Sequence, residues 1–277
     1  MFNPSKVMAK KSSVSREQCI SLIDGVGTHR KASIPSWTMW SLYKLVSNQG
    51  MTPPHNRPAA AQTAAGFKTT ATPAVLQADG LHFAYAGQAL FANFSARVMP
   101  GVTLVRGGSG RGKSTLLRLL AGTLPLTAGQ LHINGISLQD QPAAYRQQVF
   151  WTEPRTDAFD PITALEYFQL QRQNHVGFTD GHLAVLVDGL SLEPHLSKPL
   201  YMLSTGTKRK VWLAAAFASG VALTLLDEPF AALDTASIGF VMSMLEDAAT
   251  HRARAWVLAH YEAPGQVPLA CTIDLGD

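Results

Sequence analysis

The chain has 277 residues, of which 46% are hydrophobic, and its formal net charge is +4. This length and composition suit a globular protein with a sizeable core. They argue against an integral membrane protein, because the longest mostly apolar run, residues 211–226, falls short of the ~20 residues that a spanning helix needs.

The positive charge is concentrated at the start of the chain. Residues 1–73 carry 9 Lys and Arg against 2 Asp and Glu, whereas residues 74–277 carry 14 against 17. The expected folded part is therefore slightly acidic, which argues against a nucleic-acid partner. The two cysteines, Cys19 and Cys271, form no metal or redox spacing, so a reducing compartment is the simplest expectation.

Residues 1–73 are expected to lie outside the folded part. Residues 52–73 are rich in Pro, Ala and Thr, which is typical of a disordered linker. Before it, residues 37–46 carry aromatic side chains at a rough helical spacing that would suit a helix docking on a membrane surface or a partner. The basic, acid-poor composition also suits a transit peptide. A third interpretation is that the protein starts at Met51 and that residues 1–50 are an over-called leader.

From residue 74 onward, strand-like runs alternate with helix-like runs. Strands are expected over residues 75–85, 89–98, 102–105, 130–136, 222–226 and 255–259. Helices are expected over residues 113–121, 163–171, 183–190, 204–219 and 235–249. Apolar strands that alternate with helices predict an α/β core with a parallel sheet. No internal repeat is present, so a single unit is expected.

A glycine-rich turn follows the predicted strand at residues 102–105. It consists of Gly107, Gly108, Ser109, Gly110, Arg111, Gly112, Lys113, Ser114 and Thr115. Glycines allow the positive φ angles with which consecutive N–H groups converge on an anion, and the following helix adds the positive end of its dipole. Lys113 is expected to reach the β- and γ-phosphates of a nucleotide, and the Ser114 hydroxyl to hold Mg²⁺. A flexible turn with a surface lysine explains this order of strand, turn and helix less well.

Two adjacent carboxylates follow the very apolar strand predicted at residues 222–226. Asp227 and Glu228 would lie at the carboxyl end of a strand, where open α/β sheets bind ligands. Asp227 is expected to hold Mg²⁺ directly or through water, and Glu228 to polarise the water that attacks the γ-phosphate. Taken alone, two carboxylates would suit an exposed acidic turn equally well, but the apolar strand before them favours a site.

With these motifs, roughly residues 74–277 resemble the ATP-binding subunits of ABC transporters. The run LSTGTKRK at residues 203–210 is similar to the signature motif of that family, and AALD at residues 231–234 is similar to its D-loop. His260 matches the family's switch histidine, and Tyr85 matches the aromatic residue that stacks on adenine. The resemblance implies a P-loop NTPase fold with a parallel-sheet, RecA-like core, an antiparallel β subdomain and a helical subdomain over about residues 155–215.

The resemblance also implies an ATPase that binds ATP and Mg²⁺. The resemblance implies catalytic roles for Glu228, His260 and Lys113, and it implies that Ser114 and Asp227 are metal ligands. It adds Ser204, Gly206 and Asp234 to the nucleotide contacts, the helix after Ser204 facing the γ-phosphate held by a second subunit.

The implied partners are a second ATP-binding subunit, in a homodimer or heterodimer, and an integral membrane subunit. Dimerisation around two Mg·ATP would drive transport by that membrane subunit, so a cytoplasmic protein on the inner face of the cell membrane is expected. ITALEYF at residues 162–168 and the DEPFAALD run resemble the compact haem-export ATPases of cytochrome c maturation.

The chain departs from the family pattern at two places. Thr205 and Thr207 occupy two usual glycine or glutamine places of the signature motif, and Glu153 or Pro154 stands where the Q-loop glutamine is expected. In the family, that glutamine links the metal site to the membrane subunit. The sequence therefore indicates ATP binding more strongly than it indicates coupling of hydrolysis to a membrane subunit. A regulatory module that binds ATP without turnover, or an ABC protein of DNA repair or translation, are the alternatives. The acidic single unit with both Glu228 and His260 favours a transport ATPase.

Overall fold

The computed structural model describes residues 73–85, 88–153 and 156–276. All of them belong to one compact unit within Gln49–Asp277. The leader and linker expected over residues 1–73, including the helix considered at residues 37–46, fall outside the described residues except for Pro73. Cys19 and Pro154 also lie outside them.

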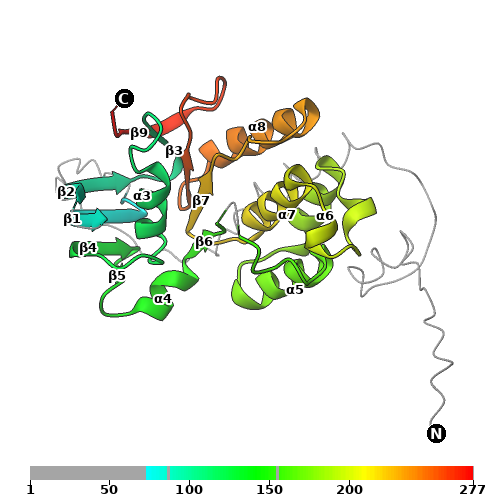
Figure 1. Ribbon diagram of the computed structural model, residues 1–277, viewed down its shortest axis with the longest axis horizontal. Helices are drawn as coiled ribbons and strands as arrows, with labels where there is room; N and C mark the ends of the chain where they lie inside the picture. Colours follow the sequence, from blue (N-terminus) through cyan, green and yellow to red (C-terminus); the bar gives the residue numbers. More distant parts are fainter. Residues whose placement is uncertain (1–72, 86–87, 154–155, 277) are drawn as a thin grey trace, which may run out of the picture. The chain divides into compact units, whose positions relative to one another are not determined.

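The strands form two sheets (Figure 1). The first is antiparallel, with the order β2-β1-β4-β5, and contains β1 Leu76–Tyr85, β2 Gln88–Val98, β4 Ala128–Ile133 and β5 Ile136–Ser137. The second is parallel, with the order β6-β7-β8-β3-β9, and contains β3 Gly101–Arg106, β6 Val149–Trp151, β7 Leu223–Asp227, β8 Ala255–Ala259 and β9 Leu269–Asp274. The predicted α/β fold with a parallel core sheet and an antiparallel β part is therefore confirmed.

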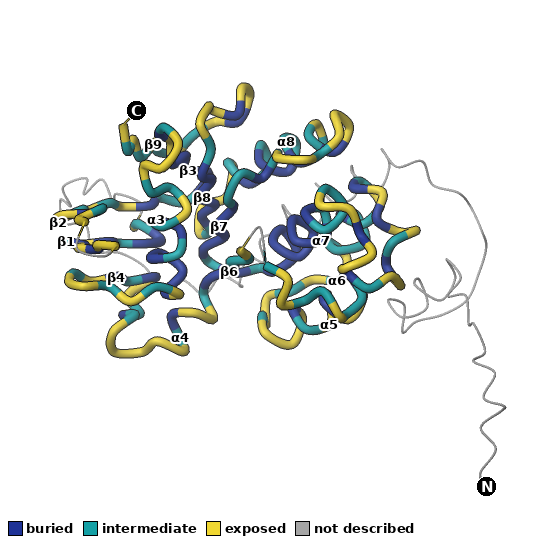
Figure 2. The backbone as a smooth tube through the Cα atoms, viewed as in Figure 1, coloured by how far each residue is buried: buried dark blue, intermediate teal, exposed yellow. Residues whose placement is uncertain are grey.

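The core lies around the central strands of the parallel sheet. All five residues of β8 are buried, as is typical of parallel strands that are covered on both faces. Helix α3, Lys113–Leu120, packs against β7 and β8 with four buried leucines. The same cluster of buried side chains includes Leu76 and Leu131 of the antiparallel sheet, so α3 is seated in a core that both sheets share. Figure 2 shows this buried interior along α3, β3, β7 and β8.

The other helices lie in the segments that connect the strands. Between β6 and β7 lie α5 Ala164–Asn174, α6 Asp180–Gly189, α7 Thr205–Ala218 and the short 3-10 turns Glu193–His195 and Leu200–Met202. Helix α7 contacts both α5 and α6, and α8, Thr235–Ala249, contacts β3. Helix α4, Pro142–Gln147, precedes β6. None of the helices in the described part of the chain is long and apolar enough to cross a membrane.

One predicted strand is wrong, because residues 130–136 form a hairpin. Strand β4 ends at Ile133 and β5 begins at Ile136, with Ile133 paired to Ile136. The turn between them is Asn134–Gly135, with φ angles of 50° and 82°. Asn-Gly is the preferred pair for a two-residue hairpin turn with two positive φ angles. The pair is therefore a turn signal, although apolar residues on both sides resemble one continuous strand. Strands β6 and β9 and helix α4 are also additions to the predicted elements.

Candidate functional site

The glycine-rich turn joins the carboxyl end of β3 to the start of α3. Gly107, Gly110 and Gly112 have φ angles of 155°, 78° and 93°, which residues with side chains rarely adopt. Gly112 is the N-cap of α3, and a Cβ on it would lie 2.9 Å from the Leu90 side chain. The backbone of this turn therefore requires its glycines, and its amides lie at the positive end of the α3 dipole.

Lys113 lies over the turn that precedes it. Its Nζ donates to the carbonyl oxygens of Gly107 at 2.7 Å and Gly108 at 3.0 Å. Gly108 in turn donates its N–H to the carbonyl of Gly276 at 3.0 Å, so the segment after β9 supports the turn from another side. Ser109, Gly110 and Arg111 are exposed, which leaves the tip of the turn open to a ligand.

The structure brings the two predicted metal ligands together. Asp227 ends β7, and Ser114 in the first turn of α3 lies close enough to its carboxyl group to lower the pKa of that group. Burial raises the pKa of Asp227 above its usual value, and the nearby Glu228 charge raises it further, against the lowering effects of Ser114, Arg209 and Lys113. A bound cation would stabilise the ionised form of this half-buried carboxyl group.

A hydroxyl and a carboxylate suit Mg²⁺, which prefers oxygen ligands and usually keeps several waters and phosphate oxygens. No cluster of three or more His, Cys, Asp or Glu that could hold a metal occurs within the described ranges. Ser114 and Asp227 therefore fit a site that the substrate's phosphates help to complete, rather than a closed protein cage.

Glu228 and His260 are in direct contact. The Glu228 Oε2 atom lies 2.7 Å from Nδ1 of His260. The strand register sets this contact, because the Glu228 N–H donates to the carbonyl of Ala259 at 3.0 Å and the His260 N–H donates to the carbonyl of Val105 at 3.1 Å. The two residues follow the neighbouring strands β7 and β8, so the parallel sheet presents both at one edge.

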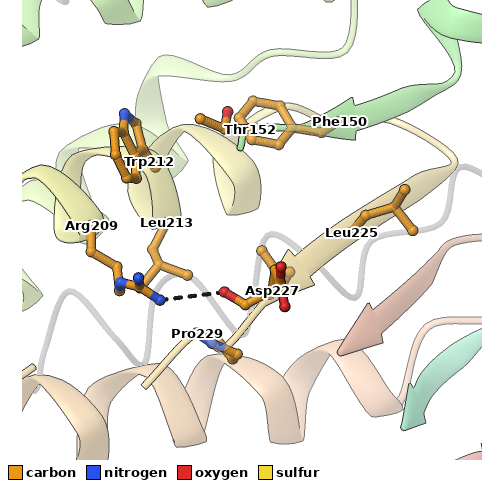
Figure 3. A pocket seen from close by; sticks show the side chains of 9 residues that line it. Phe150, Thr152, Arg209, Trp212, Leu213, Leu225, Asp227 and Pro229 are labelled. Carbon is orange, nitrogen blue, oxygen red and sulfur yellow. Dashed lines mark hydrogen bonds between the residues drawn. The ribbon is translucent and has the colours of Figure 1, made fainter. Parts of the chain in front are cut away.

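Sequence reasoning missed Arg209, which reaches from α7 to the main chain beside the two carboxylates (Figure 3). Its Nη1 donates to the main-chain carbonyl of Asp227 at 3.3 Å and to that of Glu228. The side chain lines a cavity of about 30 Å³ between α7 and the sheet, together with Thr152 and Trp212 among others. The spacing along the helix could have indicated this position. Arg209 lies three residues before Trp212, which is buried, so the two residues share one face of the helix.

A second group of predicted contacts lies at the starts of α7 and α8; we call Ser204, Gly206 and Asp234 the helix-start cluster. Ser204 is the N-cap of α7 and accepts a hydrogen bond from the Thr207 N–H at 3.1 Å. A Cβ on Gly206 would overlap the carbonyl oxygen of Ala232, so the start of α7 packs against the loop before α8.

Asp234 has a structural role within one chain. It is the N-cap of α8, accepting from the Ser237 N–H at 2.9 Å, and it pairs with the Lys210 ammonium at 2.6 Å. The hydrogen bond from Lys210, followed by those from Ser237, holds the pKa of Asp234 well below its usual range. Among the described residues, no hydrogen bond joins Ser204 or Asp234 to residues 107–115.

Tyr85 lies beside the start of α3. It is 48% exposed, its hydroxyl is 3.5 Å from Oγ1 of Thr115, and its ring stands edge-on to Phe83 with centroids 4.7 Å apart. The Tyr85 hydroxyl therefore lies near the end of the glycine-rich turn. Glu153, at the expected Q-loop position, is exposed, and its carbonyl accepts from the Thr156 N–H at 3.1 Å.

The chain matches known proteins along most of the described part. Residues 92–231 match the family model described as ABC transporter. The chain is 36% identical over 190 residues to the cytochrome c biogenesis ATP-binding export protein CcmA of Rhodospirillum rubrum, covering 68% of this chain and 79% of that protein. It is 37% identical over 168 residues to the protein of the same name from Pseudomonas savastanoi pv. phaseolicola, covering 60% and 78%.

Solved structures agree with these sequence matches. A structure described as the ATP binding subunit of an ABC transporter has a TM-score of 0.61 and 25% identity, covering 67% of this chain and 79% of its own. A putative ABC transporter ATP-binding protein from Pyrococcus furiosus has a TM-score of 0.60, covering 72% and 96%. At 19% identity, this second likeness supports the fold.

Proposed function

Because the chain belongs to the ABC transporter family as an ATP-binding ATPase subunit, we propose that Mg·ATP binds at residues 107–115 and is hydrolysed with the help of Glu228 and His260. The observation that carries this proposal is the convergence of two contacts, Ser114 with Asp227 and Glu228 with His260, at one edge of the parallel sheet. Ligands of open α/β sheets bind at this edge.

The glycine-rich turn is the proposed phosphate site. Its amides donate to phosphate oxygens, and Lys113 exchanges its two carbonyl partners for the β- and γ-phosphates. Ser114 and Asp227 hold Mg²⁺, which when bound neutralises charge on the phosphates. Tyr85 stacks on the adenine through its exposed face.

Glu228 and His260 are the proposed hydrolytic residues. Glu228 accepts a hydrogen bond from the attacking water and so polarises it toward the γ-phosphate. His260 holds the Glu228 carboxylate through its Nδ1 atom, and its other ring nitrogen is available to the γ-phosphate. This division of roles needs the two side chains at one sheet edge, which the β7–β8 register supplies.

The helix-start cluster is proposed to serve the nucleotide of a second subunit. The first N–H groups of a helix favour an anion, and Ser204 begins α7 with the small residue Gly206 beside it. Two subunits would then enclose two Mg·ATP, with Asp234 at the same interface. Residues 74–277 form the proposed ATP-binding domain, with a helical subdomain over about residues 155–215, and residues 1–73 are the proposed leader and linker.

Subunits of this family act with membrane transporter subunits. A neighbour in structure is described as part of the complex cbiONQ. We propose a separate integral membrane partner for this chain and a place on the cytoplasmic face of the membrane. The names of its relatives support export in cytochrome c biogenesis as the process, with haem export as the specific candidate.

The nucleotide-enclosed dimer is tested with Glu228→Gln in the full chain. The amide keeps the size of the carboxylate but accepts a proton poorly, so hydrolysis is expected to fall by about 10²- to 10⁴-fold while ATP stays bound. Light scattering after gel filtration in Mg·ATP should then show a dimer that dissociates into monomers when ATP is removed. A variant that hydrolyses at the wild-type rate would contradict the role of Glu228, and one that stays monomeric with ATP bound would contradict the enclosed dimer.

A further inference from the structure

The carboxylate edge of β7 is held from the helical part of the chain by one buried arginine. Arg209 on α7 is 9% exposed, although arginine is mostly an exposed residue. Its Nη1 donates to two successive main-chain oxygens, those of Asp227 and Glu228. Since a buried charge needs hydrogen-bonding partners, these two carbonyls help to keep Arg209 in place, and Arg209 in turn restrains them.

The restrained backbone has an uncommon conformation. Glu228 has a φ of 46°, in the left-handed region that residues other than glycine rarely adopt. Such a residue persists where its surroundings determine its conformation. The Glu228 N–H is held by Ala259 at 3.0 Å and its carbonyl accepts from the Ala231 N–H at 3.1 Å, and Arg209 adds a charged donor to the same carbonyl.

This backbone conformation decides where the Glu228 side chain points. The direction of the Cα–Cβ bond follows from the backbone angles, and here it brings Oε2 to 2.7 Å from Nδ1 of His260. If the φ of Glu228 changed toward a commoner value, the Glu228 carbonyl and Cβ would turn together about the N–Cα bond, and the carboxylate would leave this position. A displacement well below the length of a side chain matters, because a misplacement of ~1 Å can lower a rate on the order of 10²-fold.

We propose that Arg209 is a positioning residue for Glu228: its guanidinium holds the left-handed backbone of Glu228 and thereby sets the contact between Glu228 and His260. The inference rests on the proposed hydrolytic roles of these two residues. These two hydrogen bonds of Arg209 go to main-chain oxygens of Asp227 and Glu228 and not to the glycine-rich turn, so its removal should act on the rate of hydrolysis and leave nucleotide affinity nearly unchanged.

The chain offers a matched control at the other end of the same strand. Arg254 also donates to a main-chain oxygen, from Nε to the carbonyl of Val221 at 2.9 Å, two residues before β7 begins. Arg209→Met and Arg254→Met both remove an arginine donor from the ends of β7 while keeping an unbranched side chain. Of the two arginines, only Arg209 lies next to Asp227 and Glu228.

The experiment measures hydrolysis and binding separately in the full chain. For Arg209→Met, kcat for Mg·ATP is expected to fall at least about 10-fold, with the Kd for a non-hydrolysable ATP analogue within about 2-fold of wild type. Arg254→Met is expected to keep both values within about 2-fold. Arg209→Lys, which retains the charge and can still donate, should recover part of the lost kcat.

Equal kcat for Arg209→Met and wild type would overturn the proposal, as would a loss of affinity that accounts for the loss of activity. If circular dichroism shows that Arg209→Met is unfolded, Arg209→Lys decides: a lowered kcat at unchanged affinity supports the proposal, and an unchanged kcat contradicts it. Failure of the underlying site assignment is distinguishable, because Glu228→Gln would then hydrolyse ATP at the wild-type rate.

Discussion

Two regions differ in what their side chains contact within one chain: the glycine-rich turn with the nearby Asp227, Glu228 and His260, and the helix-start cluster. At the first, Lys113, Ser114, Asp227, Glu228 and His260 contact the turn or one another. At the second, the polar side chains cap and pair the helices that carry them. A single chain thus arranges most of the proposed chemistry, whereas its helix-start cluster has an internal structural role and would meet a nucleotide only through a second subunit. Substitutions in the first region should therefore damage activity, and those in the second should damage stability and dimerisation.

Among the substitutions that compare these two regions, Lys113→Met is expected to have the largest effect. The variant removes the cation that covers the turn, so kcat/KM for Mg·ATP should fall by about 10²- to 10³-fold, the scale observed for removal of a preorganised charge donor. The measurement is steady-state hydrolysis together with calorimetric ATP binding. Lys198→Met is the control, because Lys198 is an exposed lysine outside the site. Comparable activity of the two variants would contradict the phosphate role of the turn.

Asp227→Asn should separate activity from stability. Removing a proposed Mg²⁺ ligand is expected to lower hydrolysis at least about 10-fold. The apo protein should nevertheless melt at a higher temperature near neutral pH, because a half-buried carboxylate is no longer required to ionise.

The higher melting temperature expected for Asp227→Asn should depend on pH, in a direction that follows from the pKa of Asp227. Because the pKa of Asp227 is raised in the folded state, the folded form binds the proton more tightly than the unfolded chain, and the wild-type free energy of unfolding falls as pH rises through the raised pKa. The advantage of Asp227→Asn should be present at neutral pH and vanish in acid, where both side chains are neutral. Thermal melts without Mg²⁺ at several pH values test this, and a constant difference would contradict the assignment.

Gly206→Ala should have an intermediate effect, on the helix-start cluster. The added methyl group would overlap the carbonyl of Ala232, so unfolding free energy is expected to fall by about 1–3 kcal/mol, as for other overpacked sites. Gly239→Ala on α8 is the matched control, because a Cβ there meets no atom within 4 Å. In that helix interior, alanine should stabilise the protein by ~0.5–1 kcal/mol. Denaturant melts that place the two variants on the same side of wild type would contradict the packing described for Gly206.

The smallest effect is expected from Ser204→Ala. Loss of the N-cap hydrogen bond to Thr207 should lower the free energy of unfolding by ~1 kcal/mol. Ser204→Thr, which keeps a capping hydroxyl, should recover most of it. If urea melts show no difference between the two variants, the capping role assigned to Ser204 is wrong.

The glycine-rich turn and most regular elements could be predicted because their signals are local. The bounds expected for residues 235–249 and 255–259 coincide with α8 and β8, since a helix or strand of this length carries its own periodicity or apolar run. Strand β6 has three residues and β9 is an edge strand of alternating exposure. Both depend on pairing with strands distant in the sequence, which local patterns do not report. The hairpin turn at Asn134–Gly135 is a different case, because the Asn-Gly pair is a local turn signal that the sequence does contain.

The amino-acid order alone determined which residue types we propose for the nucleotide site: glycines that permit an anion-binding turn, a lysine and a serine behind it, and two carboxylates after an apolar strand. The tertiary structure decided which of them touch. The parallel pairing of β3, β8 and β7 places Val105, His260 and Glu228 side by side, and the packing of α7 against the sheet brings Arg209 to the backbone of the carboxylates. These contacts join residues that are distant in the chain, so they depend on the register of the sheet and the seating of the helix, which no short stretch of sequence specifies.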